Sequence, residues 1–107
     1  MKKIKKIHFV GIKGVGMAPL ALIAKQAGFE VSGSDVSEIF ITDAELKKAD
    51  IYPLVGFSEN HIDGADLVIY TSAHGGLENP EVKTATDRGI PTLNQGRALG
   101  KFQKGEM

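Results

Sequence analysis

The sequence predicts an α/β fold, in which a parallel sheet lies between two layers of helices. Short apolar runs alternate with segments of helical periodicity, which is typical of strands joined by helical crossovers. The run at 66–70 is apolar on both faces after its first residue, as expected of a covered central strand. The first apolar run ends in a glycine-rich turn that opens into a helical segment. Together these features predict a Rossmann-like three-layer domain with five parallel strands in the order 3-2-1-4-5.

The first strand is expected at 5–10 and the first helix at 16–27. The helix can start no earlier than about Val15, because Pro19 must lie in its first turn, where proline is tolerated. Gly28 supplies the helix stop. The positions expected to face the sheet repeat at helical spacing: Met17, Leu20, Ala21, Ala24 and Gly28.

The second strand, 30–34, ends at Asp35, and a helix is expected at 41–49. Thr42 is a candidate N-cap for that helix, since Glu45 follows at the spacing of a capping box. The remaining elements are expected in this order: an edge strand at 51–55 that contains Pro53, a helical turn near 58–62, a strand at 66–70, a loop at 71–79, a helix from Pro80 to Arg88, a strand at 90–93 and a last helix at 95–101.

Composition narrows the class of protein. The 107 residues fit one domain, and 13 basic residues balance 13 acidic ones, so bulk charge indicates neither a nucleic-acid partner nor an anionic membrane surface. No apolar stretch approaches the roughly 20 residues that span a bilayer. The absence of cysteine excludes disulfides and thiolate sites and fits a cytoplasmic protein. We therefore expect neither nucleic acid nor membrane as a partner.

The glycine-rich turn is the strongest functional signal. Gly11, Gly14 and Gly16 follow a strand and precede a helix, whose first N–H groups lack intrahelical partners and attract anions. Asp35 closes the second strand 19 residues beyond Gly16, a position from which a carboxylate commonly bonds ribose hydroxyls. Position 13 is lysine, so the turn departs from the standard G-x-G-x-x-G pattern. The context predicts a nucleotide or sugar-nucleotide site, and the alternative is a turn rich in glycine for tightness alone.

Other candidates lie on the same expected crevice, between the first and fourth strands. The Lys13 ammonium could meet a phosphate or remain solvated, and Asp35 could instead serve a local turn. Thr71 and Ser72 could donate hydroxyls to a ligand or act as turn residues, and His74 lies on the same rim. His61 is a weaker candidate, and His8, inside the first strand, is expected to be packed.

No catalytic set is evident, because paired carboxylates, a nucleophile with its base and a cluster of metal ligands are all missing from the sequence pattern. The segment 96–102 imitates an ATP-binding phosphate loop. It has three residues between its glycines where four are needed, and Phe102 stands where a magnesium-binding hydroxyl belongs, so we reject this reading.

These residues resemble the amino-terminal domain of the Mur ligase family. The segment 8–17, His-Phe-Val-Gly-Ile-Lys-Gly-Val-Gly-Met, is similar to the family's HFVGIGGxGM. The likeness runs over nearly the whole chain, and several separate motifs in the right order are more specific than the glycines alone. The other motifs are Val31-Ser32-Gly33-Ser34-Asp35, Thr71-Ser72-Ala73, Asn79-Pro80-Glu81-Val82 and Gly89-Ile90-Pro91-Thr92.

The resemblance implies that 1–107 is a single domain that binds the UDP part of UDP-N-acetylmuramic acid. It implies no cofactor in this domain, whereas ATP and Mg would bind in a central domain of the full-length enzyme, which activates the muramoyl carboxylate as an acyl phosphate for attack by an amine. Family members continue past such a tail into a GTHGKT-type ATP loop, so the 107-residue chain alone is expected to be inactive. The implied diphosphate residues are Gly11, Ile12, Lys13, Gly14, Val15, Gly16 and Met17, and the implied uridine residues are Asp35, Thr71, Ser72, Ala73 and His74.

Within the family, members that add L-alanine are the first choice, and the murein-recycling members are the alternative. The segment from Asn79 to Glu81 favours members that add L-alanine in peptidoglycan biosynthesis. The dipeptide Gly56-Phe57 is more similar to murein-recycling members that add L-Ala-γ-D-Glu-meso-diaminopimelate to the same UDP-sugar. Lys13 replaces a family glycine in both. A different class, an NAD(H)-binding oxidoreductase or sensor module, is the further alternative.

Overall fold

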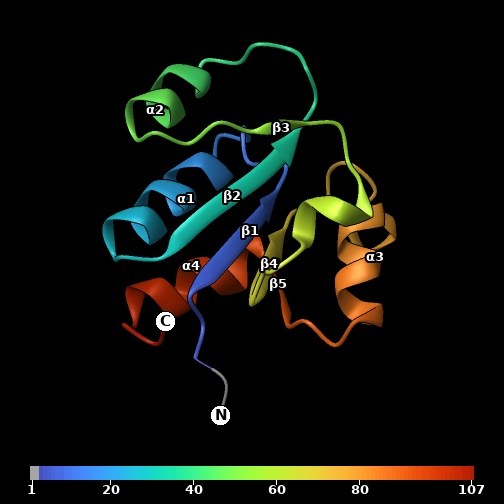
Figure 1. Ribbon diagram of the computed structural model, residues 1–107. Helices are drawn as coiled ribbons and strands as arrows, with labels where there is room; N and C mark the ends of the chain where they lie inside the picture. The colour runs from blue at the N-terminus through green and yellow to red at the C-terminus, as the bar shows by residue number, and fades with distance from the viewer. Residues whose placement is uncertain (1–2) are drawn as a thin grey trace.

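The computed structural model describes residues 3–107 and contains one five-stranded parallel sheet in the order β3-β2-β1-β4-β5 (Figure 1). The predicted fold class and strand order are confirmed. The strands are β1 (Lys6–Val10), β2 (Glu30–Asp35), β3 (Leu54–Val55), β4 (Leu67–Tyr70) and β5 (Thr92–Asn94). The helices are α1 (Met17–Gln26), α2 (Asp43–Lys48), α3 (Pro80–Asp87) and α4 (Gln95–Gln103), with short 3-10 turns η1 (Glu59–Ile62) and η2 (Gly76–Glu78).

The two faces of the sheet bury two separate cores. Alternate residues of β1 point to opposite faces, so Ile7 and Phe9 pack beneath α1 and α4, whereas Val10 packs beneath α3 and η1. Figure 1 shows α3 on the opposite side of the sheet from α1 and α4. The carboxyl ends of β1 and β4 therefore open into a crevice between the layers, where open parallel sheets place their ligands.

Helix α1 follows its predicted stripe, with one exception. Met17, Leu20, Ala21 and Ala24 are buried, but Gly28 is exposed and does not face the sheet. Its role as the helix stop is clear from geometry. Gly28 has φ +98°, its N–H bonds to the Lys25 carbonyl, and the Phe29 N–H bonds to the Ala24 carbonyl, which is the Schellman arrangement.

The capping box predicted at Thr42 is wrong. Helix α2 begins at Asp43, and the Thr42 hydroxyl donates to the Lys13 carbonyl at 2.6 Å, so it caps nothing in its own helix. A long-range partner in the glycine-rich turn thus overrides the local pairing with Glu45. The third strand is also shorter than expected, since only Leu54 and Val55 pair with β2, after Pro53. No helix among the described residues has the length and apolarity needed to cross a membrane.

Candidate functional site

The glycine-rich turn between β1 and α1 leaves two backbone N–H groups without a partner in the described part of the chain. The N–H groups of Gly11 and Ile12 both bond to the Ser34 carbonyl, at 2.9 and 3.2 Å. Residues 13 and 14 donate to the Asp35 carboxylate and the Gly11 carbonyl, and residues 17 and 18 donate to the Gly14 carbonyl. The N–H groups of Val15 and Gly16 remain. They lie just before the first turn of α1, where the partial charge is positive.

The three glycines of the turn differ in what an added side chain would contact. Gly11 has φ +78°, and an added Cβ would lie 3.1 Å from the His74 ring and 3.2 Å from the Thr71 methyl. Gly16 has ordinary helical angles, but an added Cβ would lie only 1.9 Å from Nε2 of Gln95. At Gly14 the tightest contact of an added Cβ would be 3.3 Å, to the Gly11 carbonyl. A side chain at Gly14 therefore needs a shift of a few tenths of an ångström at the Gly11 carbonyl, and it would lie on the surface of the turn that lines the pocket.

Asp35 holds the turn rather than pointing freely at a ligand. Its carboxylate is 2% exposed; Oδ2 accepts the Lys13 N–H at 2.8 Å and Oδ1 accepts the Val36 N–H at 2.7 Å. Oδ1 also lies 3.5 Å from Nε2 of His74. The residue therefore joins the end of β2 to both sides of the crevice, and its remaining acceptor capacity faces the pocket that it lines.

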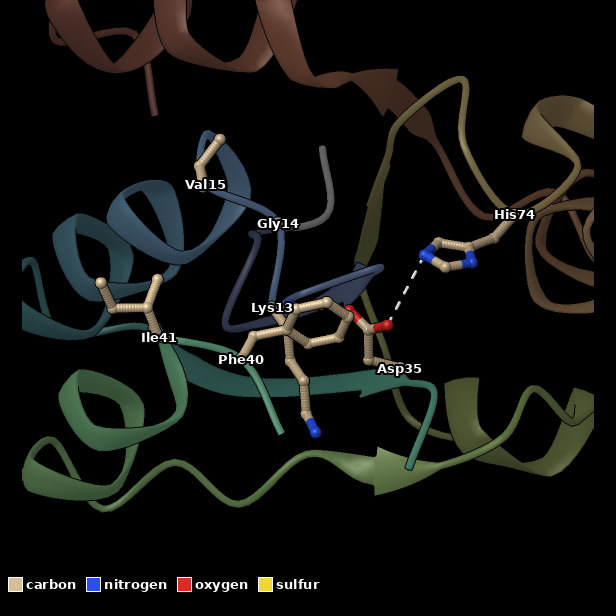
Figure 2. A pocket seen from close by; sticks show the side chains of 7 residues that line it. All are labelled: Lys13, Gly14, Val15, Asp35, Phe40, Ile41 and His74. Atoms are coloured by element: carbon tan, nitrogen blue, oxygen red, sulfur yellow. Dashed lines mark hydrogen bonds and ion pairs between the residues drawn. The ribbon is translucent and has the colours of Figure 1, made fainter. Parts of the chain in front are cut away.

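Lys13 extends away from the free N–H groups. Its ammonium donates to the Glu38 carbonyl at 2.7 Å, lies 3.4 Å from Oδ1 of Asp43, and stands 5.8 Å from the centre of the Phe40 ring. Figure 2 shows this ammonium directed away from Val15. The lysine thus fastens the segment between β2 and α2 to the turn, by a contact that no glycine could make.

His74 stands on the opposite rim. Its backbone has φ +57°, and its ring lies against Phe57 with 5.0 Å between ring centroids. The Asn79 side chain, which caps α3, donates to the His74 carbonyl at 2.9 Å. The loop after β4 therefore faces the turn after β1, as predicted, and α3 sets its position.

A pocket of about 250 Å³ opens between these two rims (Figure 2). This volume lies near the lower end for small-molecule pockets, so it suits one portion of a sugar nucleotide. Exposed apolar side chains form one wall, with Val15 83% and Ile41 87% exposed. The lining residues are Lys13, Gly14, Val15, Asp35, Phe40, Ile41 and His74.

The structure brings together five of the predicted site residues at this pocket: Lys13, Gly14, Val15, Asp35 and His74. The side chains of Ile12 and Met17 are buried in the core, and their N–H groups already have partners, so they support the turn from below. Thr71 lies beside Gly11, whereas Ser72 and Ala73 are exposed and do not line the pocket. Gly11 and Gly16 shape the turn without lining it.

Sequence reasoning missed Phe40 and Ile41, which were expected in a loop and at a helix start. The run Ile39-Phe40-Ile41 was the available signal, because three apolar residues beside a polar strand end need a partner or a ligand. Gln95 was also missed as a neighbour of the turn. It follows the carboxyl end of β5, and all parallel strands bring their carboxyl ends to the same edge of the sheet.

A buried polar cluster lies beside the crevice, beneath α3. His8 is fully buried, as expected, and its Nε2 lies 2.7 Å from Oε1 of Glu81. Oε2 of Glu81 lies 2.8 Å from Nδ1 of His61 and accepts the Ser58 N–H at 3.1 Å. Burial by itself raises the pKa of Glu81, but the hydrogen bond and charge of His8, with smaller contributions from Ser34 and Ser58, outweigh it and hold this pKa below its ordinary value.

The described residues contain no group of three or more His, Asp or Glu side chains arranged to hold a metal ion. The pocket is lined by an anchored carboxylate, an imidazole and an apolar wall, and the two free N–H groups belong to the adjoining turn. This combination can bind an anionic group beside a flat ring, with the N–H groups taking the anion and the apolar wall taking the ring.

Comparison with known proteins agrees with this geometry. The profile described as "Mur ligase family, catalytic domain" matches residues 6–106. A UDP-N-acetylmuramate–L-alanine ligase of Acetivibrio thermocellus is 45% identical over 102 residues, which are 95% of this chain and 21% of that protein. The chain therefore spans about a fifth of the length of the curated relatives it matches.

Solved structures give the same fold. A UDP-N-acetylmuramate-alanine ligase from Thermotoga maritima has a TM-score of 0.83 and 35% identity, covering 95% of this chain and 23% of the other. A UDP-N-acetylmuramate:L-alanyl-gamma-D-glutamyl-meso-diaminopimelate ligase from Neisseria meningitides has a TM-score of 0.78 and 31% identity, covering 92% of this chain and 31% of the other.

Proposed function

Because the chain belongs to the Mur ligase family, we propose that its 107 residues bind the UDP part of UDP-N-acetylmuramic acid. The diphosphate would meet the turn of residues 11–17, and the uridine would occupy the pocket between Asp35 and the loop of residues 71–74. The matched profile is described as catalytic. We propose that this span binds the nucleotide part of the substrate and that the reaction takes place in other domains.

The observation that carries the proposal is the pair of N–H groups at Val15 and Gly16, which have no partner within residues 3–107. The neighbouring N–H groups of the turn are engaged, so an incoming phosphate oxygen would find two unpartnered donors at a helix start. The adjacent apolar wall of Phe40 and Ile41 suits the flat face of a pyrimidine. Because residue 14 is glycine, no side chain at that position covers the approach to the free N–H groups or to the apolar wall.

The full-length protein would be an ATP-dependent, amide-forming ligase of peptidoglycan biosynthesis located in the cytoplasm. ATP and Mg would bind in central and C-terminal domains that lie outside these 107 residues. The segment 96–102 supports this division, because it forms part of α4 in the structure and does not form a phosphate-binding loop. The chain by itself is thus proposed to bind substrate without ligase activity.

The acceptor is proposed to be L-alanine. The curated relatives at 40–45% identity are L-alanine ligases. Among solved structures, the UDP-N-acetylmuramate-alanine ligase is 35% identical to this chain, whereas the L-alanyl-gamma-D-glutamyl-meso-diaminopimelate ligase is 31% identical and a murein peptide ligase is 26% identical. Phe57, which suggested the tripeptide-adding subgroup, packs against His74 and so has a structural role compatible with either acceptor.

Calorimetric titration tests the proposal with four ligands: UDP-N-acetylmuramic acid, UDP, NAD and ATP. We expect both uridine nucleotides to bind with one-to-one stoichiometry and NAD and ATP to give no saturable heat, because the apolar wall and the small pocket suit a pyrimidine. Saturable binding of NAD without binding of UDP would replace the proposal with the oxidoreductase or sensor alternative.

A further inference from the structure

The carboxamide of Gln95 lies directly on the glycine that closes the turn. An added Cβ on Gly16 would be 1.9 Å from Nε2 of Gln95, 2.8 Å from its Cδ and 3.3 Å from its Oε1. The backbone of Gly16 has φ −93° and ψ −24°, which any residue adopts. The end of the Gln95 side chain can therefore occupy this place only because residue 16 is glycine, and the backbone angles do not demand glycine.

The fold fixes Gln95 in this place. It is the first residue of α4, and Asn94, which pairs with Tyr70 at the end of β5, caps that helix through a 2.9 Å bond from the Arg97 N–H. Gln95 is half-buried, and its carboxamide makes no hydrogen bond or ion pair within residues 3–107. Its backbone is fixed at the start of α4, and a half-buried polar group without a partner is available for a ligand.

Three unpartnered donors therefore lie at or beside Gly16: the N–H groups of Val15 and Gly16 and the NH2 group of Gln95. They come from opposite sides of the crevice, from the turn after β1 and from the start of α4. A phosphate has several acceptor oxygens and can take donors from both sides at once, whereas one water molecule accepts only two.

We propose that Gln95 contacts the diphosphate of a nucleoside diphosphate and helps to select ligands that carry one. This inference rests on the proposed function, since it names a further residue of the same site. Gln95 donates through its NH2 group to a phosphate oxygen that the turn also holds. A ligand without phosphate gains nothing from this residue.

Two substitutions test the contact in the 107-residue chain. Gln95→Leu keeps the volume and removes the donor, and we expect UDP to bind three- to tenfold more weakly. Gln95→Glu adds a negative charge, and we expect a loss of more than tenfold. Thermal unfolding should not fall for Gln95→Glu, because an acidic residue in the first turn of α4 is favourable. Uridine, titrated by NMR, should bind all three proteins within twofold.

The matched control is Gln103→Glu, which makes the same change of charge at the exposed far end of α4. UDP should bind this variant within twofold of the wild type. If Gln103→Glu weakens UDP binding as much as Gln95→Glu does, the effect comes from the change in net charge alone, and the proposed contact is overturned. If both Gln95 variants bind UDP with wild-type affinity while Gly14→Val loses binding, the Gln95 contact is overturned. The proposed binding of the diphosphate at the turn of residues 11–17 is then retained. Failure of the wild-type chain to bind UDP would instead remove the proposed function.

A double-mutant cycle with Gly16→Ala gives a second, independent test. The added methyl must displace the end of the Gln95 side chain, so Gly16→Ala already removes the contact. We expect Gln95→Leu to change UDP affinity by less than twofold in the Gly16→Ala background. Full additivity of the two losses would show that Gln95 acts elsewhere and would contradict the proposal.

Discussion

At the scale of single residues, the turn after β1 shows that three glycines in one motif do three different things. Gly11 supplies a positive φ and room for His74, Gly16 makes room for Gln95, and Gly14 keeps the ligand side of the turn bare. Lys13, between them, anchors the segment that follows β2, since its ammonium is held by the Glu38 carbonyl and Asp43.

The clearest test at this scale is Gly14→Val. We expect UDP to bind at least tenfold more weakly, because the side chain would cover the approach to the free N–H groups. We expect the domain to stay folded, because Gly14 has no positive φ and its one tight Cβ contact, 3.3 Å to the Gly11 carbonyl, needs a shift of only a few tenths of an ångström. Calorimetry measures the affinity and circular dichroism the fold. Gly100→Val in α4, where an added Cβ meets nothing within 4 Å, is the control. Unchanged UDP affinity in Gly14→Val would remove the turn from the site.

At the scale of elements, α3 is docked by charge as well as by apolar packing. Val82 and Ala85 fill the core beneath it, and Glu81 reaches His8 on β1 and His61 on η1. Next to Glu81, Asn79 caps α3 and holds the His74 carbonyl. One helix start thus fixes the rim of the crevice, so the position of His74 depends on a pair of residues buried away from the ligand.

This arrangement predicts the effect of Glu81→Gln. The pKa of Glu81 is lower in the folded state than its ordinary value of 4.5, so the ionised carboxylate stabilises the fold above that pH and loses its contribution as the pH falls below it. We expect Glu81→Gln to lower the free energy of unfolding by about 3 kcal/mol near pH 7, as for other broken buried pairs. The difference from the wild type should shrink below pH 4.5.

Chemical denaturation at several pH values measures this difference. Glu78→Gln is the control, since Glu78 lies just before α3 and is exposed. Its free energy of unfolding should stay within about 0.5 kcal/mol of the wild type, as is usual for surface substitutions. A Glu81→Gln variant that matches the wild type at every pH would contradict the role of the buried carboxylate.

At the scale of the whole molecule, the proposed ligand site lies at one edge of the sheet. All five strands are parallel, so the turns and loops at their carboxyl ends gather together, and the connections at their amino ends lie at the far edge. The pocket draws its lining from three separate segments at the carboxyl edge, near residues 13–15, 35–41 and 74.

Hydrogen–deuterium exchange with and without UDP tests this placement. We expect slower exchange of the amides at 15–16, 38–41 and 73–75 when UDP is bound, because the free N–H groups gain an acceptor and the two rims gain a shared partner. The connections at 27–29 and 88–90, at the amino edge, should not change. Protection confined to the amino edge would place the ligand elsewhere on the molecule.

The sequence by itself determined the number of strands and their order, and it predicted a candidate site at the carboxyl edge of the sheet. Apolar periodicity, Pro19 before the helix interior and the glycine turn are local signals, and the right-handed crossover rule converts them into a topology. The same local rules were wrong for Thr42, whose hydroxyl bonds to the Lys13 carbonyl 29 residues away in place of its own helix.

Only the tertiary structure decided which groups of the turn remain free to act. Backbone N–H groups donate to both carboxylate oxygens of Asp35, and the Lys13 ammonium bonds to the segment after β2. The Gln95 side chain, which is 79 residues further along the chain, lies against Gly16. These outcomes depend on hydrogen bonds and contacts between segments remote in sequence. Periodicity and spacing describe only neighbours along the chain, so the free N–H groups of Val15 and Gly16 become visible only after every competing partner has been placed.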